Sequence, residues 1–349
     1  MFNTEVLSKT FLTFAERECK GSSLLYEYLS KKIASNETLL EICSSARTGQ
    51  PVPNLLFGAV HYLLLNGKEH PLKEYYPSIV NNPKLFNESF EDFKDFCLKY
   101  RNEIESILKT KLVQTNEVRR CAYLYPAFCT IYEKSKKPLA LIEIGTSAGL
   151  QLLWDKYSYS YGRNNIYGNK DSKLNISAEI KGENIPILHS TPPPVSTRVG
   201  LDLNIVDLKN EEEHLWLKSL IWPEHKERLF MFEEAASYIK DGSVHLVDGD
   251  GISLLPEYVE NIPEDSAICI FHTHVANQIS LEMKKRLLKT VETIGKERDV
   301  FHIYNNVQDR FLHLDYYLDG IESQNTIAAT DGHGRWFEWF LKNELPITQ

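Results

Sequence analysis

The sequence predicts an α/β protein in two parts: an all-helical amino-terminal domain, then a mostly parallel sheet with a carboxy-terminal antiparallel hairpin. Three observations support this fold class. Apolar residues recur at steps of three and four up to about residue 135, short apolar runs alternate with amphipathic stretches from residue 138 onward, and two strand-like runs near the end have no helix between them. We therefore expect a helical domain at 1–135 and a sheet domain at 136–349.

The amino-terminal domain is expected to be a set of helices separated by prolines. Helical periodicity covers 90–108 and 118–132, and shorter helices fit 24–33 and 54–65. Prolines punctuate the segments between them without forming a long low-complexity linker. Such a domain would cap the sheet or help to bind a substrate.

The sheet domain is predicted from five short apolar runs, each expected to be a strand. They are 139–144, 197–203, 243–247, 267–272 and 300–304. The helices expected between them are 212–219, 224–239 and 280–297, the last of which has an apolar packing face.

Two segments of the sheet domain depart from this alternation. Residues 311–318 and 325–329 resemble strands joined by a turn at 319–323, which indicates an antiparallel hairpin at the sheet edge. Residues 157–195 are rich in Tyr, Asn, Gly and Lys and end in three prolines. We interpret them as an insertion between the first helix and the second strand.

Composition limits the expected partners. The net charge of −9 and the pI of about 5.7 lack the basic footprint of a protein that holds phosphate backbones, so nucleic acid is not expected. No stretch approaches the roughly 18 apolar residues of a membrane span, and no secretory signal pattern begins the chain. Six scattered cysteines lack CxxC spacing and are expected to be reduced and buried. We expect a cytoplasmic protein with a small-molecule partner, and the oligomeric state stays open.

The segment 139–150, LALIEIGTSAGL, carries the strongest functional signal. An apolar run ends in Glu143 and opens through Gly145 and Gly149 into an expected helix, which is typical of a ligand-binding turn in a Rossmann-like sheet. A carboxylate inside an apolar strand is costly without partners, which favours a function for it. Ser147 replaces the middle glycine, so a pyrophosphate could not approach closely, whereas S-adenosylmethionine, which has no pyrophosphate, tolerates the change.

The same segment also matches a GxSxG nucleophile elbow with Ser147 as the nucleophile. Asp248 and His333 would then complete a Ser, Asp, His order. An elbow normally follows several strands, whereas the chain before residue 139 is predicted to be helical, and no HGGG-like oxyanion loop lies upstream. Serine hydrolysis is therefore kept as an alternative.

Acidic residues follow the second and third expected strands. Asp202, in RVGLDLN, stands where an acid accepts hydrogen bonds from ribose hydroxyls, although the insertion separates it from Glu143 by far more than the roughly 20 positions of a compact unit. Asp248, Gly249 and Asp250 follow the third strand, where an aspartate would meet an adenine amino group. Turn or helix caps are the structural alternatives for these aspartates.

Candidate acid–base groups surround the same expected crevice. His272 and His274 end the fourth strand, and either would serve as a general base or orient a substrate, since imidazole titrates near neutrality. A hydrogen-bonded structural role is the alternative for both. A metal site is disfavoured, because no third ligand is convincingly spaced. Glu117 is a further candidate base.

The polar cluster QTNEVRR, at 114–120, leads into the helix before the first strand. Its Gln114, Asn116 and Arg120 either cap and salt-bridge the helix start or line an acceptor pocket. Near the end of the chain, His333 lies between two glycines on a turn from which it would reach the crevice.

Several motifs together resemble one family. EIGTSAGLQLLWDKYSYSYG, QTNEVRR, RVGLDLN, LIWPEHKERL, GHGRWFEW at 332–339 and PNLLFGAVHYLLL at 53–65 are similar to an uncharacterised bacterial domain family related to class I S-adenosylmethionine-dependent methyltransferases. The likeness spans nearly the whole chain. It implies the Rossmann-like fold and the cofactor, but the family supplies no established activity.

The resemblance also implies roles for individual residues. The first methyltransferase motif corresponds to Glu143, Gly145, Thr146, Ser147 and Gly149, the ribose-binding acid to Asp202, and the adenine-side acid to Asp248 or Asp250. The chain departs from the wider pattern after the fourth strand, where FHTHV replaces an NPPY-like motif. The usual argument for methylation of amino groups on nucleobases or glutamine is thereby lost.

These features predict an S-adenosylmethionine-dependent methyltransferase that acts on an unknown small or medium acceptor. Catalysis would consist mainly of alignment, with His272, His274 or Glu117 removing a proton from an oxygen or nitrogen acceptor. A non-catalytic S-adenosylmethionine-binding module is the main alternative. A dinucleotide-dependent oxidoreductase is a weaker one.

Overall fold

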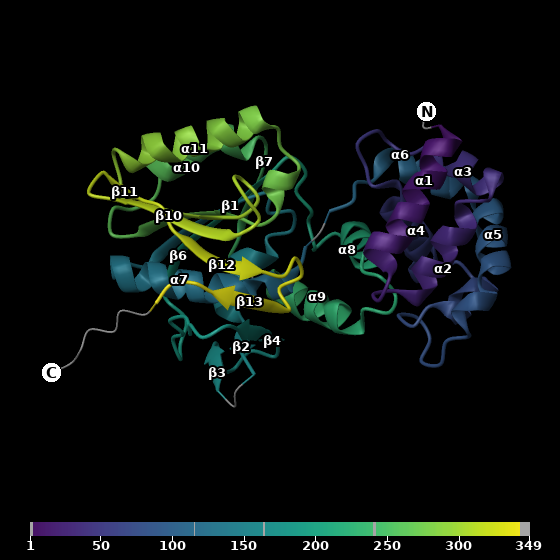
Figure 1. The fold of residues 1–349 in the computed structure, drawn as a ribbon, viewed down its shortest axis with the longest axis horizontal. Helices are drawn as coiled ribbons and strands as arrows, with labels where there is room; N and C mark the ends of the chain where they lie inside the picture. The colour runs from purple at the N-terminus through teal and green to yellow at the C-terminus, as the bar shows by residue number, and fades with distance from the viewer. Residues whose placement is uncertain (1–2, 115, 163–164, 240–241, 343–349) are drawn as a thin grey trace. The chain divides into compact units, whose positions relative to one another are not determined.

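The computed structural model describes residues 3–114, 116–162, 165–239 and 242–342. The chain divides into two compact units (Figure 1). The first comprises Met1–Thr115 and Lys209–Phe230, and the second comprises Asn116–Leu208 and Met231–Gln349. The first unit thus ends before the expected boundary at residue 135, and it gains a second segment from later in the chain.

The first unit is helical, as its periodicity predicts. Its α-helices are α1 (Thr4–Phe14), α2 (Leu24–Ile33), α3 (Glu37–Cys43), α4 (Val52–Leu65), α5 (Phe90–Lys99), α6 (Arg101–Thr110) and α8 (Glu211–Ser219). Three shorter helices accompany them: η1 (Ala15–Cys19) is a π-helix, and η2 (Pro71–Tyr75) and η3 (Phe86–Glu88) are 3-10 helices. Side chains of Asn3, Ser23 and Asn36 cap the first three helices. The periodic stretch 90–108 is two helices, because Tyr100 leaves the helical region with ψ 28°.

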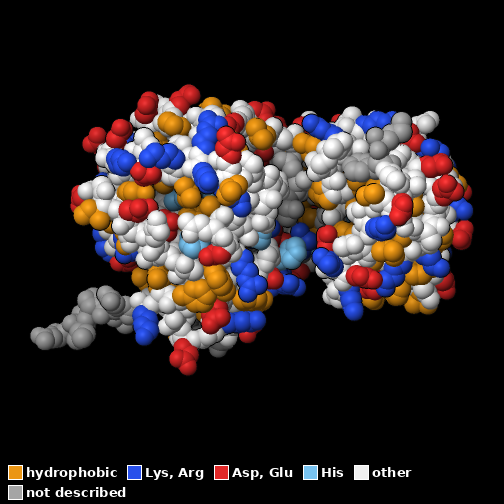
Figure 2. Space-filling view, turned by 45° about the horizontal axis from the view of Figure 1, so that its top comes forward, with side chains coloured by type: hydrophobic (Ala, Val, Ile, Leu, Met, Phe, Trp, Pro, Cys, Tyr) orange, Lys and Arg blue, Asp and Glu red, His pale blue; other side chains and the backbone are white. Residues whose placement is uncertain are grey.

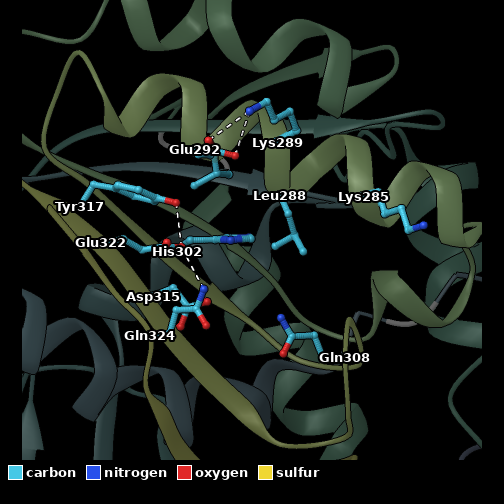
Figure 3. Close-up of a pocket in the computed structure, with 11 residues that line it drawn as sticks. Lys285, Leu288, Lys289, Glu292, His302, Gln308, Asp315, Tyr317, Glu322 and Gln324 are labelled. Carbon is cyan, nitrogen blue, oxygen red and sulfur yellow. Dashed lines mark hydrogen bonds and ion pairs between the residues drawn. The ribbon is translucent and has the colours of Figure 1, made fainter. Parts of the chain in front are cut away.

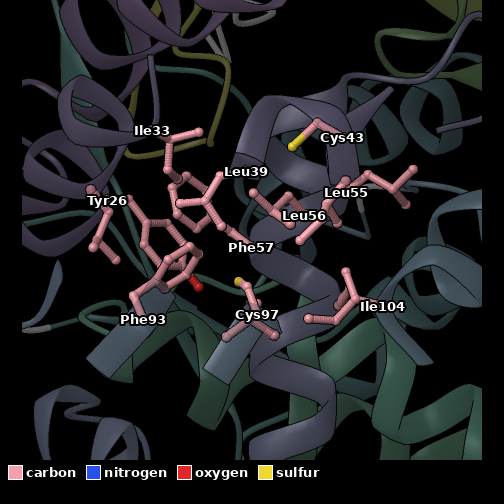
Figure 4. Close-up of a cluster of buried hydrophobic side chains, with 14 of the residues drawn as sticks. Tyr26, Ile33, Leu39, Cys43, Leu55, Leu56, Phe57, Phe93, Cys97 and Ile104 are labelled. Carbon is pink, nitrogen blue, oxygen red and sulfur yellow. The ribbon is translucent and has the colours of Figure 1, made fainter. Parts of the chain in front are cut away.

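Helix α4 lies at the centre of this unit because VPNLLFGAVHYLLL has no continuous polar face. Phe57 stacks on Tyr26 with ring centroids 4.1 Å apart, within the buried cluster that Figure 4 shows. Helix α8 packs against α4, and the Trp216 indole N–H donates to the carbonyl of Leu112 at 2.8 Å. The segment 209–230 therefore supplies part of the helical core.

The second unit is built on a sheet that, across the described residues, contains ten strands in the order β5-β13-β12-β10-β9-β8-β1-β6-β7, with β11 beside β10. Its parallel strands include β1 (Leu139–Ile144), β6 (Val195–Asp202), β7 (His245–Asp248), β8 (Ala267–His272) and β9 (Val300–Tyr304). All five predicted strands are present, and the sheet is mostly parallel around β1.

The carboxy-terminal strands are antiparallel, as predicted. They are β10 (Leu312–Leu318), β11 (Ile321–Ser323), β12 (Thr326–Thr330) and β13 (Trp336–Trp339). The expected turn at 319–323 contains β11, which pairs with β10. The hairpin is therefore larger than the sequence pattern indicates.

Helices cover both faces of the parallel strands. On one face, α10 (Gly251–Glu260) and α11 (Leu281–Gly295) share a buried cluster with Ile142 and Ile270. On the other face, α7 (Cys121–Ser135) places Phe128 4.5 Å from Trp154 and 5.4 Å from Phe271 between ring centroids. Helix α7 was expected in the helical domain, but it is buried against the sheet and so belongs to the second unit. Helix α9 (Lys226–Ile239) precedes β7.

The segment after β1 differs from the expected helix and insertion. A 3-10 helix, η5 (Leu150–Lys156), replaces an α-helix, since Gly149 is left-handed and Leu153 has non-helical φ and ψ. In the insertion, β2 (Ser158–Ser160), β3 (Ile166–Gly168) and β4 (Asn175–Ser177) form a small sheet, while β5 (Glu179–Lys181) pairs with β13. The insertion therefore supplies an edge strand of the main sheet.

The cysteines, the charged side chains and the helices can each be located in the structure. All six cysteines are buried, as predicted. On the face that Figure 2 shows, acidic and basic side chains are interspersed. In the described part of the chain, no helix has the length and apolar character needed to cross a membrane.

Candidate functional site

Three neighbouring strands end in unusual backbone conformations. Ser147 follows β1, His274 follows β8 and Asn306 follows β9, with φ of 51°, 63° and 62°. Positive φ is uncommon outside glycine and costs about 1–3 kcal/mol where it is strained, and such residues cluster at ligand sites and active sites. Since these strands are adjacent, the carboxyl edge of the sheet around β1 is the candidate functional site.

Glu143 is the buried acid of this site. Its side chain is on β1, the residue is 3% exposed, and its Oε2 accepts a hydrogen bond from the Thr146 hydroxyl at 2.6 Å. Burial raises the pKa of Glu143 to about 8, with a contribution from Asp202, while the Thr146 bond and Arg120 act in the opposite direction. Glu143 therefore holds a proton at neutral pH and can donate a hydrogen bond.

Asp202 lies at the end of β6 beside the same turn. Its Oδ2 accepts from the Ser147 N–H at 2.7 Å, and its Oδ1 accepts from the Asn204 N–H at 3.0 Å. Burial raises the pKa of Asp202, and these N–H groups oppose the rise. The next residue, Leu203, is 80% exposed although it is apolar. A carboxylate beside an exposed apolar side chain suits a ligand with hydroxyl groups and an apolar ring.

The residues after β7 have two roles: Asp248 and Gly249 lie at the carboxyl edge, and Asp250 begins a helix. Asp248 accepts from the Ile205 N–H at 3.2 Å, and the Gly249 N–H donates to the Asp202 carbonyl at 2.8 Å. Asp250 caps α10 through the Ile252 N–H at 3.1 Å and also pairs with an arginine of α11. Asp248 and Gly249 therefore lie beside Asp202, whereas the carboxylate of Asp250 is used by the helix cap that the sequence offered as its alternative role.

The two glycines of the β1 turn are required by packing within the chain. Gly145 has φ 73°, and a Cβ there would lie 2.2 Å from Val275 Cγ2. Gly149 has φ 76°, and a Cβ there would lie 2.9 Å from Leu246. Both glycines shape the turn, and the side chains closest to them belong to the protein itself.

Arg120 connects three segments at this edge. Its Nε donates to the Gly332 carbonyl at 3.0 Å, and its Nη1 lies 3.4 Å from the Thr273 hydroxyl. Thr273 in turn donates to Gln151 Oε1 at 3.1 Å. The 3-10 turn η4 (Val118–Arg120), the end of β8 and the turn before β13 are thus joined through one guanidinium group.

A buried carboxylate holds a half-exposed histidine at the same place. Glu117 is 3% exposed, and its Oε2 lies 3.2 Å from His333 Nδ1, whose side chain is 47% exposed. A carboxylate on one ring nitrogen orients the imidazole and leaves the other nitrogen available for proton transfer. This pair is separated by 216 positions in the sequence.

His274 lies next to this pair but differs from it electrostatically. Its backbone N–H donates to Asn305 Oδ1 at 2.8 Å, and this bond holds the chain in place after β8. Burial and the charges of Arg120 and His333 lower the pKa of His274 to about 4. His274 is therefore neutral at pH 7 and a weak base.

Three buried polar atoms at this edge have no hydrogen-bond partner among the described residues. They are Ser147 Oγ, His274 Nε2 and Asn116 Nδ2. Buried polar atoms are nearly always paired in proteins, so a group of them calls for an explanation. These atoms keep hydrogen-bonding capacity that a polar ligand at this edge could use.

One predicted site residue, His272, lies on the opposite face of the sheet from Glu143. His272 is fully buried and packs with His302 and Tyr304, 5.3 and 6.0 Å away between ring centroids, on the face that carries Ile270 rather than Glu143. Burial lowers its pKa to about 4. Gln114 belongs to the helical unit.

The alternative chemistries find less support from the geometry. Ser147 has the left-handed backbone of a nucleophile elbow, but its hydroxyl finds no hydrogen-bond partner in the described parts of the chain, and His333 contacts Glu117. No group of three or more His, Cys, Asp or Glu residues in the described parts is arranged to hold a metal ion.

Sequence reasoning missed several residues of the site. Leu203 follows the predicted acid, and its exposure is visible only in the fold. Gln151, Thr273 and Asn305 take part through contacts 31 to 153 positions apart. Local patterns carry no signal for such contacts.

The fold and this edge define a mixed α/β protein with a candidate ligand site at the carboxyl ends of its parallel strands. The chain belongs to a family described as uncharacterised proteins conserved in bacteria (DUF2332), whose model matches residues 8–339. No curated protein and no solved structure matches the chain.

Proposed function

We propose that the protein binds S-adenosylmethionine at this edge and transfers its methyl group to a small or medium acceptor. One observation carries the proposal. Acids at the carboxyl ends of two adjacent parallel strands are both hydrogen-bonded to one glycine-rich turn, Glu143 through the Thr146 hydroxyl and Asp202 through the Ser147 N–H.

The order of the strands supports the proposal. The parallel strands lie side by side in the order β7, β6, β1, β8, β9. Numbered one to five along the chain, they have the order 3-2-1-4-5. This is the order of a doubly wound Rossmann-like sheet, which binds nucleotide-like ligands where the chain reverses direction beside its first strand. We therefore propose that the second unit has a Rossmann-like fold.

The residues at this edge fit the cofactor. Asp202 retains lone pairs for the two ribose hydroxyls, and the exposed Leu203 offers an apolar surface for adenine. The unpartnered Ser147 Oγ is available to a polar group of the ligand. Asp248 lies in register with Asp202, where an adenine amino group would donate.

S-Adenosylmethionine, when bound, supplies a methyl group on a sulfonium, which is already activated for transfer. An oxygen or nitrogen acceptor must also lose a proton, and His333 is the group best placed to take it, because Glu117 orients its ring and its side chain is accessible. Arg120, Thr273 and Gln151 would position the acceptor.

Variants at the acids test the proposed site through the affinity for radiolabelled S-adenosylmethionine in equilibrium dialysis. Asp202→Ala removes a carboxylate that accepts charge-assisted hydrogen bonds, so we expect affinity to fall about tenfold or more. Asp265→Asn, at an exposed aspartate outside the edge, is the control and should bind as the wild type does. Equal affinity in all three proteins would remove Asp202 from the site.

A second assay separates an enzyme from a binding module. Methyl transfer from the radiolabelled cofactor to a small-molecule extract should occur with the wild type and fall by about two orders of magnitude or more in His333→Ala, as is typical for loss of a general base. Binding without transfer to any acceptor would favour the non-catalytic module.

A further inference from the structure

A pocket lies on the face of the sheet that α11 covers (Figure 3). Its volume is about 400 Å³, within the range of small-molecule sites. His302, on its floor, is in register with Ile270, and Ile270 is in register with Ile142. Because side chains alternate along a strand, His302 and Glu143 lie on opposite faces, and this pocket is separate from the site at the carboxyl edge.

The floor of the pocket carries an incompletely paired imidazole. His302 is 1% exposed, and its Nε2 has no hydrogen-bond partner among the described residues. Leu288 of α11 lies beside it and provides an apolar surface. Burial lowers the pKa of His302 well below its usual value, so the ring is neutral.

One end of the pocket is anionic. Asp315 accepts from the Tyr304 hydroxyl at 2.6 Å and from the Asn325 N–H at 3.0 Å. Glu322 accepts from the Tyr317 hydroxyl at 2.8 Å and from a glutamine amide at 2.9 Å. These donors are all neutral, so within the described residues no lysine or arginine pairs with either carboxylate.

The other end is cationic. Lys285 lines the pocket and makes no ion pair or hydrogen bond with another described residue, whereas Lys289, one turn further along α11, is held by Glu292 at 3.0 Å. Figure 3 shows Lys285 on the far side of Leu288 from Asp315, and Gln308 below Leu288. An ammonium group and two carboxylates, none with a counterion among the described residues, thus line the same pocket on opposite sides of Leu288.

We propose that this pocket binds a zwitterionic small molecule of the amino-acid class. The ligand's ammonium group would pair with Asp315 and Glu322, its carboxylate with Lys285 and Gln308, and its side chain would lie against Leu288 and His302. Each ligand charge would meet a protein charge that lacks a counterion, which makes the pairing favourable despite the partial burial.

Binding can be measured directly on the full chain. Each of the common protein amino acids is screened at millimolar concentration by thermal shift, and those that stabilise the protein are titrated by calorimetry. We expect at least one to bind, and its carboxamide and N-acetyl derivatives, which each lack one charge, to bind about tenfold more weakly or worse.

Variants assign the binding to this pocket. Asp315→Asn and Lys285→Ala should each weaken the affinity about tenfold, while Lys170→Ala, at an exposed lysine outside the pocket, should leave it unchanged. Lys285 is exposed, so its variant keeps the test valid even where the buried Asp315 variant does not fold.

Three results would overturn the proposal. They are the absence of amino-acid binding by folded protein, equal affinity for an amino acid and its carboxamide, and wild-type affinity in Lys285→Ala. None of these depends on whether the protein binds S-adenosylmethionine.

Discussion

Glu143 combines deep burial, one hydroxyl partner and a neighbouring acid in a single side chain. Its pKa is about 8 in the folded protein against 4.5 in the unfolded chain. Between these values the folded state holds a proton that the unfolded state has released, so rising pH favours unfolding by up to about 1.4 kcal/mol per unit.

We therefore expect Glu143→Gln to gain stability relative to the wild type as pH rises from about 5 to 8. The substitution keeps an oxygen for Thr146 and removes the titration. The free energy of unfolding, measured in urea across this range, checks the expectation, with the exposed Glu260→Gln as control. A difference between variant and wild type that stays constant with pH would contradict it.

His272 produces the opposite pH dependence. Its pKa falls from 6.5 to about 4 on folding because burial disfavours the charged ring. The unfolded chain binds the proton first, so the contribution of His272 to stability is complete above pH 6.5 and is lost as pH falls toward 4.

In His272→Phe, which retains an aromatic ring, we expect a shallower loss of stability between pH 6.5 and 4. The slope should decrease by up to about 1.4 kcal/mol per unit. Urea unfolding at several pH values measures it, and His189→Phe, at a partly exposed histidine, is the comparison. Parallel curves for wild type and His272→Phe would show that His272 is not buried as described.

At the scale of elements, the turn between β1 and η5 is fixed against η6 (Val275–Asn277), because Gly145 leaves room for the Val275 side chain and no more. Gly145→Ala should lower the free energy of unfolding by about 2–4 kcal/mol, from strain at positive φ and a steric clash together. Adding Val275→Ala should recover the steric part.

Gly320→Ala provides the matched control for this prediction. Gly320 has nearly the same φ, 75°, but open space around its Cβ position, so its variant reports the backbone strain alone. Equal losses of stability in Gly145→Ala and Gly320→Ala would contradict the tight packing at the turn.

Local patterns predicted the elements that are buried on both faces. The runs 139–144, 267–272 and 300–304 match β1, β8 and β9 to the residue, because central strands of a parallel sheet are buried on both faces and so are mostly apolar. The pattern failed at η5, where Gly149 prevents an α-helix. It also gave no signal for β5, whose pairing with β13 joins distant parts of the chain.

In the candidate site, the residues at strand ends could be predicted from the sequence, as the central strands could. Glu143, Asp202 and Asp248 could be placed at strand ends, and the structure brings them to one edge. The side-chain direction of His272 depends on the strand's register in the sheet, and the contact of Glu117 with His333 depends on a turn far along the chain. Neither can be obtained from a local pattern.

At the scale of the whole molecule, the helical unit is discontinuous in sequence. Trp216, from the segment 209–230, is 4% exposed in the core formed by residues before 115. Trp216→Ala should therefore lower the free energy of unfolding by about 3–5 kcal/mol. Phe230→Ala, at a residue of the same segment that is 53% exposed, should change it by less than about 1 kcal/mol. Similar small effects in both would contradict the assignment of this segment to the helical core.

The proposed activity depends on the carboxyl edge of the second unit holding a nucleoside-containing cofactor. Calorimetric titration of the folded wild type with S-adenosylmethionine and with S-adenosylhomocysteine tests this most directly. We predict saturable binding of both ligands at one site per chain, abolished in the double variant Glu143→Ala, Asp202→Ala. Absence of heat with either ligand, on protein shown to be folded, would contradict the proposal.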